Sequence, residues 1–421
     1  MDSGRKVAVV GAGIAGLAAA WLIARRHEVD LFEAAPRLGG HVNTVDATVG
    51  GVTVPVDTGF IVHNPLNFPN IVALFRTLGV ATEDSDMSFA VSARGGAFEY
   101  AGGLGPAGIF AQPENLLSPR FWGMLADILR FNACARRALA LPDDVSFGAW
   151  LDREGFTGAV RDDHLLPMAA AIWSASTGSI LAFPAASLFR FLDAHGLLRV
   201  FGRPQWRTVS GGCRSYVSAL IRDFGGRVYS GVPVATVTRH GDSAALELGA
   251  GDVREYDAVV MATHADRTLA MLRDADDDER DVLNAFRFAP NRAVLHRDPA
   301  FMPRRRRAWA SWNYVTGAHG GYVTYWMNRL QNIDAVANLF VTLDPPEEPR
   351  EILASFDYEH PQFDAASVGA QHRLGGIQGR NRTWFCGAWC GYGFHEDGLK
   401  SAMRVAQDFG ATAPWETEPP A

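Results

Sequence analysis

The stretch VAVVGAGIAGLAAAWLIARRHEVDLFE, residues Val7–Glu33, carries the pattern that decides the fold. Residues Lys6–Val10 are short, β-branched and apolar, which predicts a buried strand. After the glycines, Leu17–Ala24 is rich in the alanines that suit a helix packed closely on a sheet. His27–Phe32 predicts a second strand, which ends on the carboxylate of Glu33. The order strand, glycine turn, helix, strand and acid predicts a Rossmann-like βαβ unit.

The glycines form a G-x-G-x-x-G motif, in which each glycine has its own physical task. The first allows a tight turn, the second lets the backbone approach a pyrophosphate, and the third lets the helix pack on the strand. The N–H groups that open the helix would face the phosphates, and the acid would accept hydrogen bonds from a ribose. A glycine triplet alone also fits an ordinary turn, but the complete order favours a dinucleotide site. Its candidate residues are Gly11, Gly13, Ile14, Ala15, Gly16 and Glu33.

Composition bounds the kind of protein. The chain has 421 residues, which favours two domains, and 48% hydrophobic with 20% charged residues is typical of a globular protein. The formal net charge of −7 argues against nucleic acid as a main partner. The four cysteines form no CxxC pair and have no histidines at metal-ligand spacing, so we expect reduced thiols and no metal site.

The sequence also bears on location. We find no signal-peptide pattern and no run of about 18 apolar residues, so we expect a cytoplasmic protein with no membrane span. These features leave open a peripheral contact with the inner face of a membrane. They say nothing about the oligomeric state.

The segment that follows the acid, AAPRLGGHVNT, distinguishes FAD from NAD. A second glycine turn so close to the ribose acid suggests backbone pressed against more of the same ligand. This segment resembles the flavoprotein superfamily of amine oxidases, phytoene desaturases and protoporphyrinogen oxidases, which carry a Glu, an Arg and a Gly-Gly-Arg here. In this chain His41 takes the place of the last arginine. The resemblance implies non-covalent FAD, with further contacts from Ala34, Arg37, Gly39, Gly40 and His41.

Four later segments resemble the same superfamily, although each alone also fits a strand, turn and helix packed for structural reasons. They are VPVDTGFIV at Val54–Val62, Ser210–Val237, Tyr256–Leu272, and TWFCGAWCGYGFHEDGLKSAMRVA at Thr383–Ala406. The last one would direct a helix N-terminus at the N1–C2=O edge of the flavin. The cofactor contacts that the resemblance implies in these segments are Asp57, Thr58, Gly59, Val234, Ala262, Thr263, Gly387, Ala388, Phe394, Asp397 and Gly398.

The resemblance also implies a fold and a division into domains. We expect an α/β protein with a Rossmann-like FAD-binding domain of the glutathione-reductase type and a discontinuous, mixed α+β, amine-oxidase-like substrate domain. The FAD-binding domain would take residues 1–60, 205–265 and 375–421, and the substrate domain residues 61–204 and 266–374.

More closely, GGHVNTVD, DMSFAVS, FMPRRRRAWASWNY and GFHEDGLKSA resemble a bacterial subgroup of amine-oxidase-type flavoproteins. That subgroup is associated with lipid methyltransferases similar to cyclopropane-fatty-acid synthase. This resemblance implies a fatty-acyl substrate and a lipid methyltransferase as a partner. The corresponding prediction is desaturation of a long apolar substrate by hydride transfer to the flavin. A double-bond isomerase, an amine oxidase and a non-catalytic FAD-bearing partner of a methyltransferase are the alternatives.

Candidate catalytic residues are fewer, because a bound flavin performs most of the redox chemistry. His395 precedes the C-terminal helix, where it would either relay a proton or bond to backbone. Tyr392 is a candidate for lining the pocket. Amine oxidases hold a lysine near flavin N5, and the corresponding strand here, Pro290–His296, offers Arg292 instead.

Two segments raise the hypothesis of membrane contact. Asn115–Leu141 combines a broad apolar surface with arginines, which fits either an interfacial helix or a core helix with solvated arginines. Arg304–Arg307 precedes Trp309 and Trp312, and it fits either a lipid headgroup contact or a solvated loop.

Overall fold

The structure is a computed structural model. It describes residues 4–142, 144–173, 176–199, 202–317, 320–334 and 337–417.

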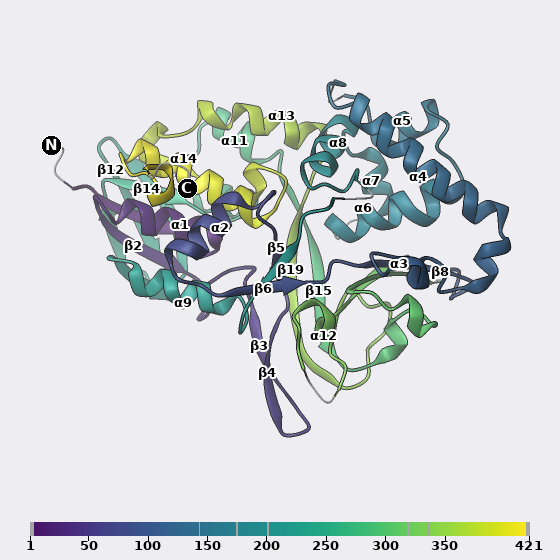
Figure 1. The fold of residues 1–421 in the computed structure, drawn as a ribbon. Coiled ribbons are helices and arrows are strands. Elements are labelled where there is room, and N and C mark those ends of the chain that lie inside the picture. The colour runs from purple at the N-terminus through teal and green to yellow at the C-terminus, as the bar shows by residue number, and fades with distance from the viewer. Residues whose placement is uncertain are drawn as a thin grey trace.

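A five-stranded parallel sheet organises the half of the molecule that holds both ends of the described chain (Figure 1). The strand order is β10-β2-β1-β14-β20, so β1 lies at the centre, where the G-x-G-x-x-G turn leaves its carboxyl end. The strands are β1 Lys6–Val10, β2 Glu28–Glu33, β10 Arg227–Ser230, β14 Ala258–Met261 and β20 Thr383–Phe385. This sheet brings segments from the beginning, middle and end of the chain together.

Different elements cover the two faces of this sheet. Because side chains alternate along a strand, Val7 and Val9 pack with the helices on one face, whereas Ala8 and Val10 pack on the other. The first face carries α1 Ile14–Ile23, α2 Pro69–Thr77, α9 Arg214–Asp223 and α14 His395–Asp408. The second face carries an antiparallel sheet with two helices, namely β11 Val234–His240, β12 Ser243–Leu248, β13 Val253–Tyr256, α10 Ala265–Met271 and α11 Asp277–Leu283.

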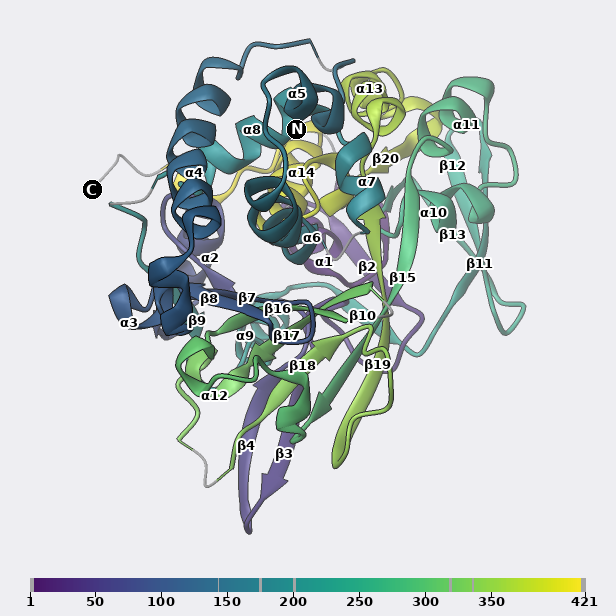
Figure 2. The same ribbon diagram turned by 90° about the vertical axis from the view of Figure 1, so that its right-hand side faces the viewer.

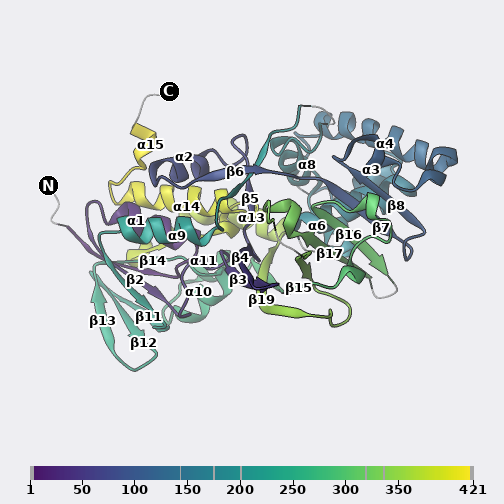
Figure 3. The ribbon, with the colours of Figure 1, turned by 60° about the horizontal axis from the view of Figure 1, so that its bottom comes forward.

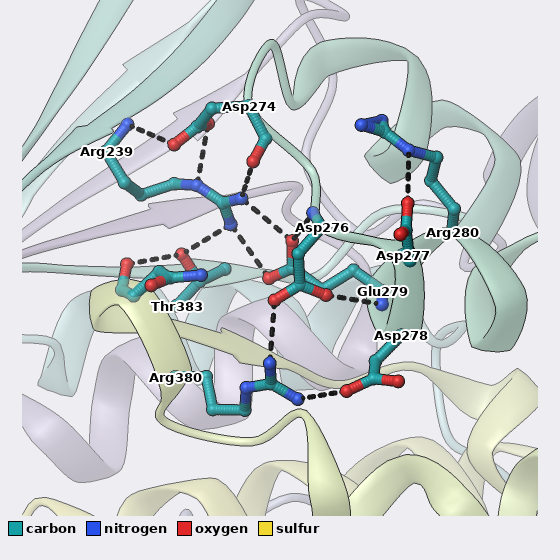
Figure 4. A network of polar contacts seen from close by, with 10 residues as sticks. Arg239, Asp274, Asp276, Asp277, Asp278, Glu279, Arg280, Arg380 and Thr383 are labelled. Atoms are coloured by element: carbon teal, nitrogen blue, oxygen red, sulfur yellow. Dashed lines mark hydrogen bonds and ion pairs between the residues drawn. The ribbon is translucent and has the colours of Figure 1, made fainter.

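A buried ion-pair network fixes this second face (Figure 4). Arg239 of β11 donates from Nε to Asp274 at 2.8 Å and from Nη2 to Glu279 of α11 at 2.8 Å. Just before β20, Arg380 pairs with Asp276 at 2.9 Å. The network therefore ties residues 274–280 to the half with the parallel sheet, although the sequence analysis assigned them to the substrate domain. The domain boundaries themselves stay a prediction.

A seven-stranded mixed sheet organises the other half, with the order β19-β15-β18-β17-β16-β7-β8. All neighbouring strands are antiparallel except β16 and β7. The long strands β15 and β19 run between the two halves (Figures 1 and 3). The strands are β7 Phe89–Ala93, β8 Phe98–Gly102, β15 Arg287–His296, β16 Trp312–Gly317, β17 Gly320–Trp326, β18 Phe340–Leu343 and β19 Ile352–Gln362.

Helices cover one face of this sheet, as Figure 2 shows. They share one large hydrophobic cluster with the strands, and this cluster includes Phe131, Trp150, Phe189 and Tyr314. The helices are α4 Pro119–Arg137, α5 Phe147–Arg153, α6 Leu166–Trp173, α7 Thr177–Ala182 and α8 Ala185–Ala194.

Shorter elements complete the fold. The β3–β4 hairpin projects from between the halves, and β5, β9 and β6 form a small sheet beside it. In the described part of the chain, we find no helix that is long and apolar enough to span a membrane. The remaining elements are β3 Thr44–Val49, β4 Val52–Asp57, β5 Val62–His63, β6 Thr82–Ser85, β9 Trp206–Val209, α3 Gly105–Ile109, α12 Met327–Leu330, α13 Ala365–Arg373 and α15 Pro414–Thr417.

Candidate active site

The turn after β1 is built to hold an anion. Gly11 has φ +101°, which a side chain rarely adopts, and its N–H donates to Phe32 O at 2.8 Å. Helix α1 then begins at Ile14, with Gly13 as its N-cap, no side-chain cap and no acidic residue in its first turn. The first N–H groups of a helix have no partner within it, so Ile14 and Ala15 present donors at the positive end of the helix dipole.

The glycines of this turn divide into two kinds. A Cβ on Gly16 would lie 1.8 Å from Gly11 O, so this glycine permits the helix to pack on the turn. Gly40 is similarly tight, since its Cβ would lie 2.9 Å from Gly13 Cα. A Cβ on Gly13 itself would meet no protein atom within 4 Å. Gly13 therefore faces open space next to the helix N-terminus, which fits a pyrophosphate against its backbone.

The carboxylate of Glu33 is held in place at the end of β2. It accepts from the N–H of Ala12 at 2.8 Å and from the N–H of Ala35, just past Ala34, at 2.9 Å. Its main-chain carbonyl accepts from Val232 at 2.9 Å, which brings the segment before β11 alongside, with Val234 two residues further on. Each carboxylate oxygen keeps a lone pair, so this acid can still accept from a ribose diol.

The second glycine turn lies directly against the first. The N–H of Gly39 donates to Ala12 O at 2.8 Å, and the guanidinium of Arg37 donates to Gly40 O at 2.8 Å and to Val42 O. Arg37 thus stabilises its own turn through these hydrogen bonds. Its guanidinium charge lies beside the predicted pyrophosphate site. The structure therefore places the two glycine turns and Glu33 next to one another.

His41, which replaces the expected arginine, belongs to a half-buried group of aromatic and polar side chains. Its ring lies edge-on to Tyr358 with centroids 4.7 Å apart, and its Nε2 lies 3.4 Å from Nε2 of His360. Burial lowers the pKa of His41 well below its usual range and that of His360 to about 4. Both rings are neutral at pH 7, so His41 does not supply the positive charge of the arginine it replaces.

The Asp57-Thr58-Gly59 segment is a structural junction next to this group. Asp57 is fully buried, accepts from the N–H of Cys213 at 3.0 Å, and accepts from Gln331 at 2.7 Å. Thr58 Oγ1 lies 2.7 Å from the hydroxyl of Tyr358, and a Cβ on Gly59 would lie 2.0 Å from His41 O. These residues hold the polypeptide close to His41. Both carboxylate oxygens of Asp57 accept hydrogen bonds from protein groups.

The end of β14 and the turn after β20 lie on the other side of the predicted cofactor site. Ala262 donates to Val10 O at 2.8 Å, and Thr263 O accepts from the indole of Trp389 at 3.0 Å. The N–H of Gly387 donates to Ser401 Oγ of α14 at 3.0 Å. Ala388 begins the short turn Ala388–Cys390 directly after Gly387.

The N-terminus of α14 meets that of α1. A Cβ on Gly398 would lie 2.8 Å from Ile14 Cγ2 and 3.8 Å from Ala15 Cβ, so the two helices start side by side. Asp397 caps α14, because its Oδ2 accepts from the N–H groups of Tyr392 and Phe394, each at 3.1 Å. Burial raises the pKa of Asp397 to about 6. Two positive helix ends thus converge on one place, which favours a ligand with phosphate and an electron-rich ring.

His395 lies at the start of α14 but turns into the protein. Its ring stacks on Phe60 with centroids 3.7 Å apart, and its Nε2 has no hydrogen-bond partner among the described groups. Burial lowers the pKa of His395 to about 3. The ring is therefore neutral at pH 7 and a weak base, which does not favour the predicted proton relay.

Arg292 is not brought to this group. Its guanidinium pairs with Glu348 at 2.6 Å and donates to Ser355 at 3.0 Å, in an exposed position on β15. Because faces alternate along a strand, its neighbour Asn291 points the opposite way, toward the face of Tyr358, and is buried with Oδ1 unpartnered. The inward polar residue of this strand is therefore Asn291.

An aromatic cluster lies on the other side of the α14 N-terminus. Phe394 stacks on Phe191 at 4.9 Å, Phe191 lies 5.7 Å from Tyr392, and Trp173 lies 4.6 Å from Phe191. A pocket opens beside this cluster. It is lined by Trp173, Ser179, Ile180, Phe183, Pro361, Gln362 and Phe363.

Sequence reasoning missed Tyr358, His360 and Asn291. The signal for the first two was the YEH triplet, since residues two apart in a strand share a face. No group of three or more His, Cys, Asp or Glu side chains in the described ranges is arranged to hold a metal ion.

Together, the parallel sheet, the uncapped glycine turn and the converging helix ends define a dinucleotide-binding flavoprotein. The family model for flavin-containing amine oxidoreductases matches residues 14–287. The chain belongs to this family, so its expected cofactor is FAD and its class is the flavin-dependent oxidoreductases. No curated protein matches the sequence.

Solved structures share the fold over nearly the whole chain. Cyclohexylamine oxidase from Brevibacterium oxydans IH-35A has a TM-score of 0.71 at 16% identity, covering 97% of this chain and 100% of that one. A CLA-producing fatty acid isomerase from P. acnes has a TM-score of 0.69 at 16% identity, covering 97% and 99%. Putrescine oxidase bound to putrescine has 0.68 at 17% identity, covering 96% and 98%. The predicted α/β, amine-oxidase-like fold is thus confirmed, while the substrate is not fixed by these identities.

Proposed function

We propose that this flavin-dependent oxidoreductase dehydrogenates a long apolar substrate, with a fatty acyl chain as the substrate class. The observation that carries the proposal is the aromatic cluster beside the N-terminus of α14. Trp173, Phe191 and Phe394 pack against one another there, with Trp173 and Phe191 buried, and a small cavity beside them is lined mainly by apolar side chains. A hydrocarbon chain that enters between these side chains would gain free energy by leaving water.

The two carboxylates near the cluster, Glu396 and Asp397, already accept hydrogen bonds from groups of the protein. Glu396 accepts from Asn70 Nδ2 at 2.6 Å and from the N–H of Ile71 at 3.0 Å, where it caps α2. Asp397 is occupied in capping α14. A cationic amine bound beside Phe394 would therefore compete with these backbone contacts for a counter-charge.

The residues of this chain would act by holding and orienting. The Gly13 turn and the start of α1 would hold the pyrophosphate, Glu33 the ribose, and the start of α14 the flavin ring. FAD held there would supply the acceptor for a hydride from one carbon of the substrate. The apolar walls exclude water, and the proton of the adjacent carbon needs a base within the site. His41 and His360, whose Nε2 atoms lie 3.4 Å apart, are candidates for that base.

The test is anaerobic mixing of FAD-loaded protein with unsaturated or methyl-branched acyl lipid. We expect loss of the oxidised flavin absorbance and a product that is two hydrogens lighter by mass spectrometry. Phe191→Ala should slow this bleaching at least about tenfold, because it opens a hole in the aromatic wall. The matched control, Tyr229→Ala, removes an aromatic side chain from β10, outside the cluster, and should leave the rate near that of the wild type.

Three outcomes would contradict the proposal. Bleaching by amines and not by lipids would assign an amine oxidase. A product of unchanged mass with a displaced double bond would assign an isomerase. A partner methyltransferase whose activity needs the protein but not a reducible flavin would assign a non-catalytic role.

A further inference from the structure

An exposed apolar stripe runs from the short turn before α4 along α4. Leu117 is 89% exposed, Leu129 58%, and Leu116 and Trp122 49% each. Trp122 and Leu129 are seven residues apart, so they lie on the same side of the helix, with Ala126 between them. The other side of α4 is core, since Phe121 and Phe131 are buried. We call Leu116, Leu117, Trp122 and Leu129 the α4 stripe.

Several exposed positive charges border the α4 stripe. Residues 113–137 contain four arginines and two carboxylates, in a chain whose formal net charge is −7. Arg137 donates to Ala133 O at 3.3 Å and to Cys134 Sγ at 3.5 Å. Arg130 lies over Phe156 at 3.8 Å and also pairs with Asp127 at 3.0 Å. Arg120 pairs with Asp163, and Arg136 lies 3.7 Å from Asp193, so Arg137 is the arginine of this group that has no carboxylate partner among the described residues.

We propose that the α4 stripe docks the protein on an anionic lipid bilayer, with its leucines and tryptophan among the acyl chains and its arginines at the headgroups. The inference rests on the proposed function. Large exposed apolar side chains in contiguous positions are unusual in a soluble surface. At a membrane surface, leucines contact acyl chains, tryptophan lies at the interface, and arginines contact anionic headgroups. A second copy of this acidic chain does not offer acyl chains and anionic headgroups in that order.

The position of α4 connects the membrane to the aromatic cluster. Its buried face packs on α8, with Phe131 and Phe189 6.0 Å apart. Two residues further along α8, Phe191 stacks on Phe394 of the cluster. Docking through the α4 stripe would therefore place the bilayer on the helical side of the substrate pocket, where an acyl chain is available.

Two arginines of the basic run at residues 304–307 are engaged within the protein. Arg305 is tied to the buried carboxylate of Glu99 at 3.1 Å, and Arg306 lies between Trp309 and Trp326, at 3.8 Å and 4.4 Å. Two of its four charges therefore serve the fold.

Co-sedimentation with vesicles of phosphatidylglycerol and phosphatidylcholine tests the proposal, using FAD-loaded protein. We expect wild type to bind, and Leu117→Asp/Leu129→Asp to bind at least about tenfold more weakly, because two apolar side chains leave the bilayer. Arg137→Gln should weaken binding about fivefold on these vesicles and little on pure phosphatidylcholine. Val253→Asp is the matched control, since Val253 is 61% exposed on β13 in the other half.

Equal binding of wild type and the double variant would overturn the proposal, as would absence of binding by the wild type. A wild-type dimer in light scattering that the double variant abolishes, without vesicle binding, would assign the stripe to a second copy instead. Turnover separates this proposal from the proposed function. The double variant should lose activity on vesicle lipid at least about tenfold and keep it on acyl substrate in detergent micelles. If neither the wild type nor the variants turned over vesicle lipid or micellar acyl substrate, the proposed function would be refuted. The docking proposal would still stand on the vesicle-binding result.

Discussion

The contrast between Gly13 and Gly16 gives the sharpest test of the cofactor site. Both glycines belong to one motif, but an added Cβ meets no protein atom within 4 Å at Gly13 and lies 1.8 Å from Gly11 O at Gly16. Gly13→Ala should therefore fold and lose FAD, whereas Gly16→Ala should damage the fold itself.

The magnitudes follow from the local geometry. Gly13 has φ −72° and ψ −178°, which alanine adopts without strain. Alanine is a poorer N-cap than glycine by about 0.5 kcal/mol, and the lower entropy of its unfolded chain offsets a similar amount. The free energy of unfolding of the FAD-free protein should thus change by less than about 1 kcal/mol. At Gly16 the methyl overlaps backbone, so the cost should be about 3 kcal/mol or more.

The effect on FAD should be much larger than the effect on stability. A methyl on Gly13 would occupy the space next to the first N–H groups of α1 and push a pyrophosphate away from them. Each hydrogen bond to a charged group contributes about 1.5–3 kcal/mol, so losing two weakens FAD binding by about a hundredfold or more.

Urea unfolding of FAD-free protein and fluorescence titration with FAD measure the two effects separately. Wild-type FAD affinity in a folded Gly13→Ala variant would refute the placement of the pyrophosphate. Normal stability of Gly16→Ala would refute the packing role of that glycine.

Three further substitutions test other parts of the site. Glu33→Ala should weaken FAD binding at least about tenfold and unfold at lower urea, because it frees two backbone N–H groups; titration and urea melts check both. Burial raises the pKa of Asp397 from 3.8 to about 6. The folded protein therefore binds more protons than the unfolded chain between these values, and stability should fall by up to about 3 kcal/mol as the pH rises through that window. Asp397→Asn should remove this slope from FAD-free urea midpoints measured at pH 4, 5 and 6. Asp57→Ala should cost about 2–4 kcal/mol, because Cys213 N–H and Gln331 lose a buried acceptor; an unchanged urea midpoint would contradict this.

The parts of the fold visible in the sequence are those that depend on local patterns. The strand, glycine turn and helix at residues 6–23 follow from apolar runs, an N-terminal glycine and alanine spacing, and they appear almost as expected. Glu33 is likewise fixed locally, since it ends a strand that must pair with β1. The amine-oxidase-like fold was implied by the resemblance of a series of such segments to a flavoprotein superfamily.

Features that depend on distant contacts were not available to the same reasoning. Arg292 stood on the expected strand, but its direction depends on the register of β15 with β19 and on Glu348, more than 50 residues later. One side of the helix within Asn115–Leu141 is core and the other is exposed, as the neighbours Phe121 and Trp122 illustrate. Only the packing partners of α4 decide which side faces water.

The start of α14 is the element on which the site depends most. It touches α1 through Gly398 and Ile14, so it shares a boundary with the glycine turn that would hold the pyrophosphate. One turn earlier, Phe394 packs on Phe191 of the aromatic cluster. Any cofactor lying along both helix ends therefore comes within reach of whatever the cluster binds. Because Asp397 fixes the backbone of Tyr392 and Phe394, it couples the geometry of the substrate wall to that of the cofactor wall.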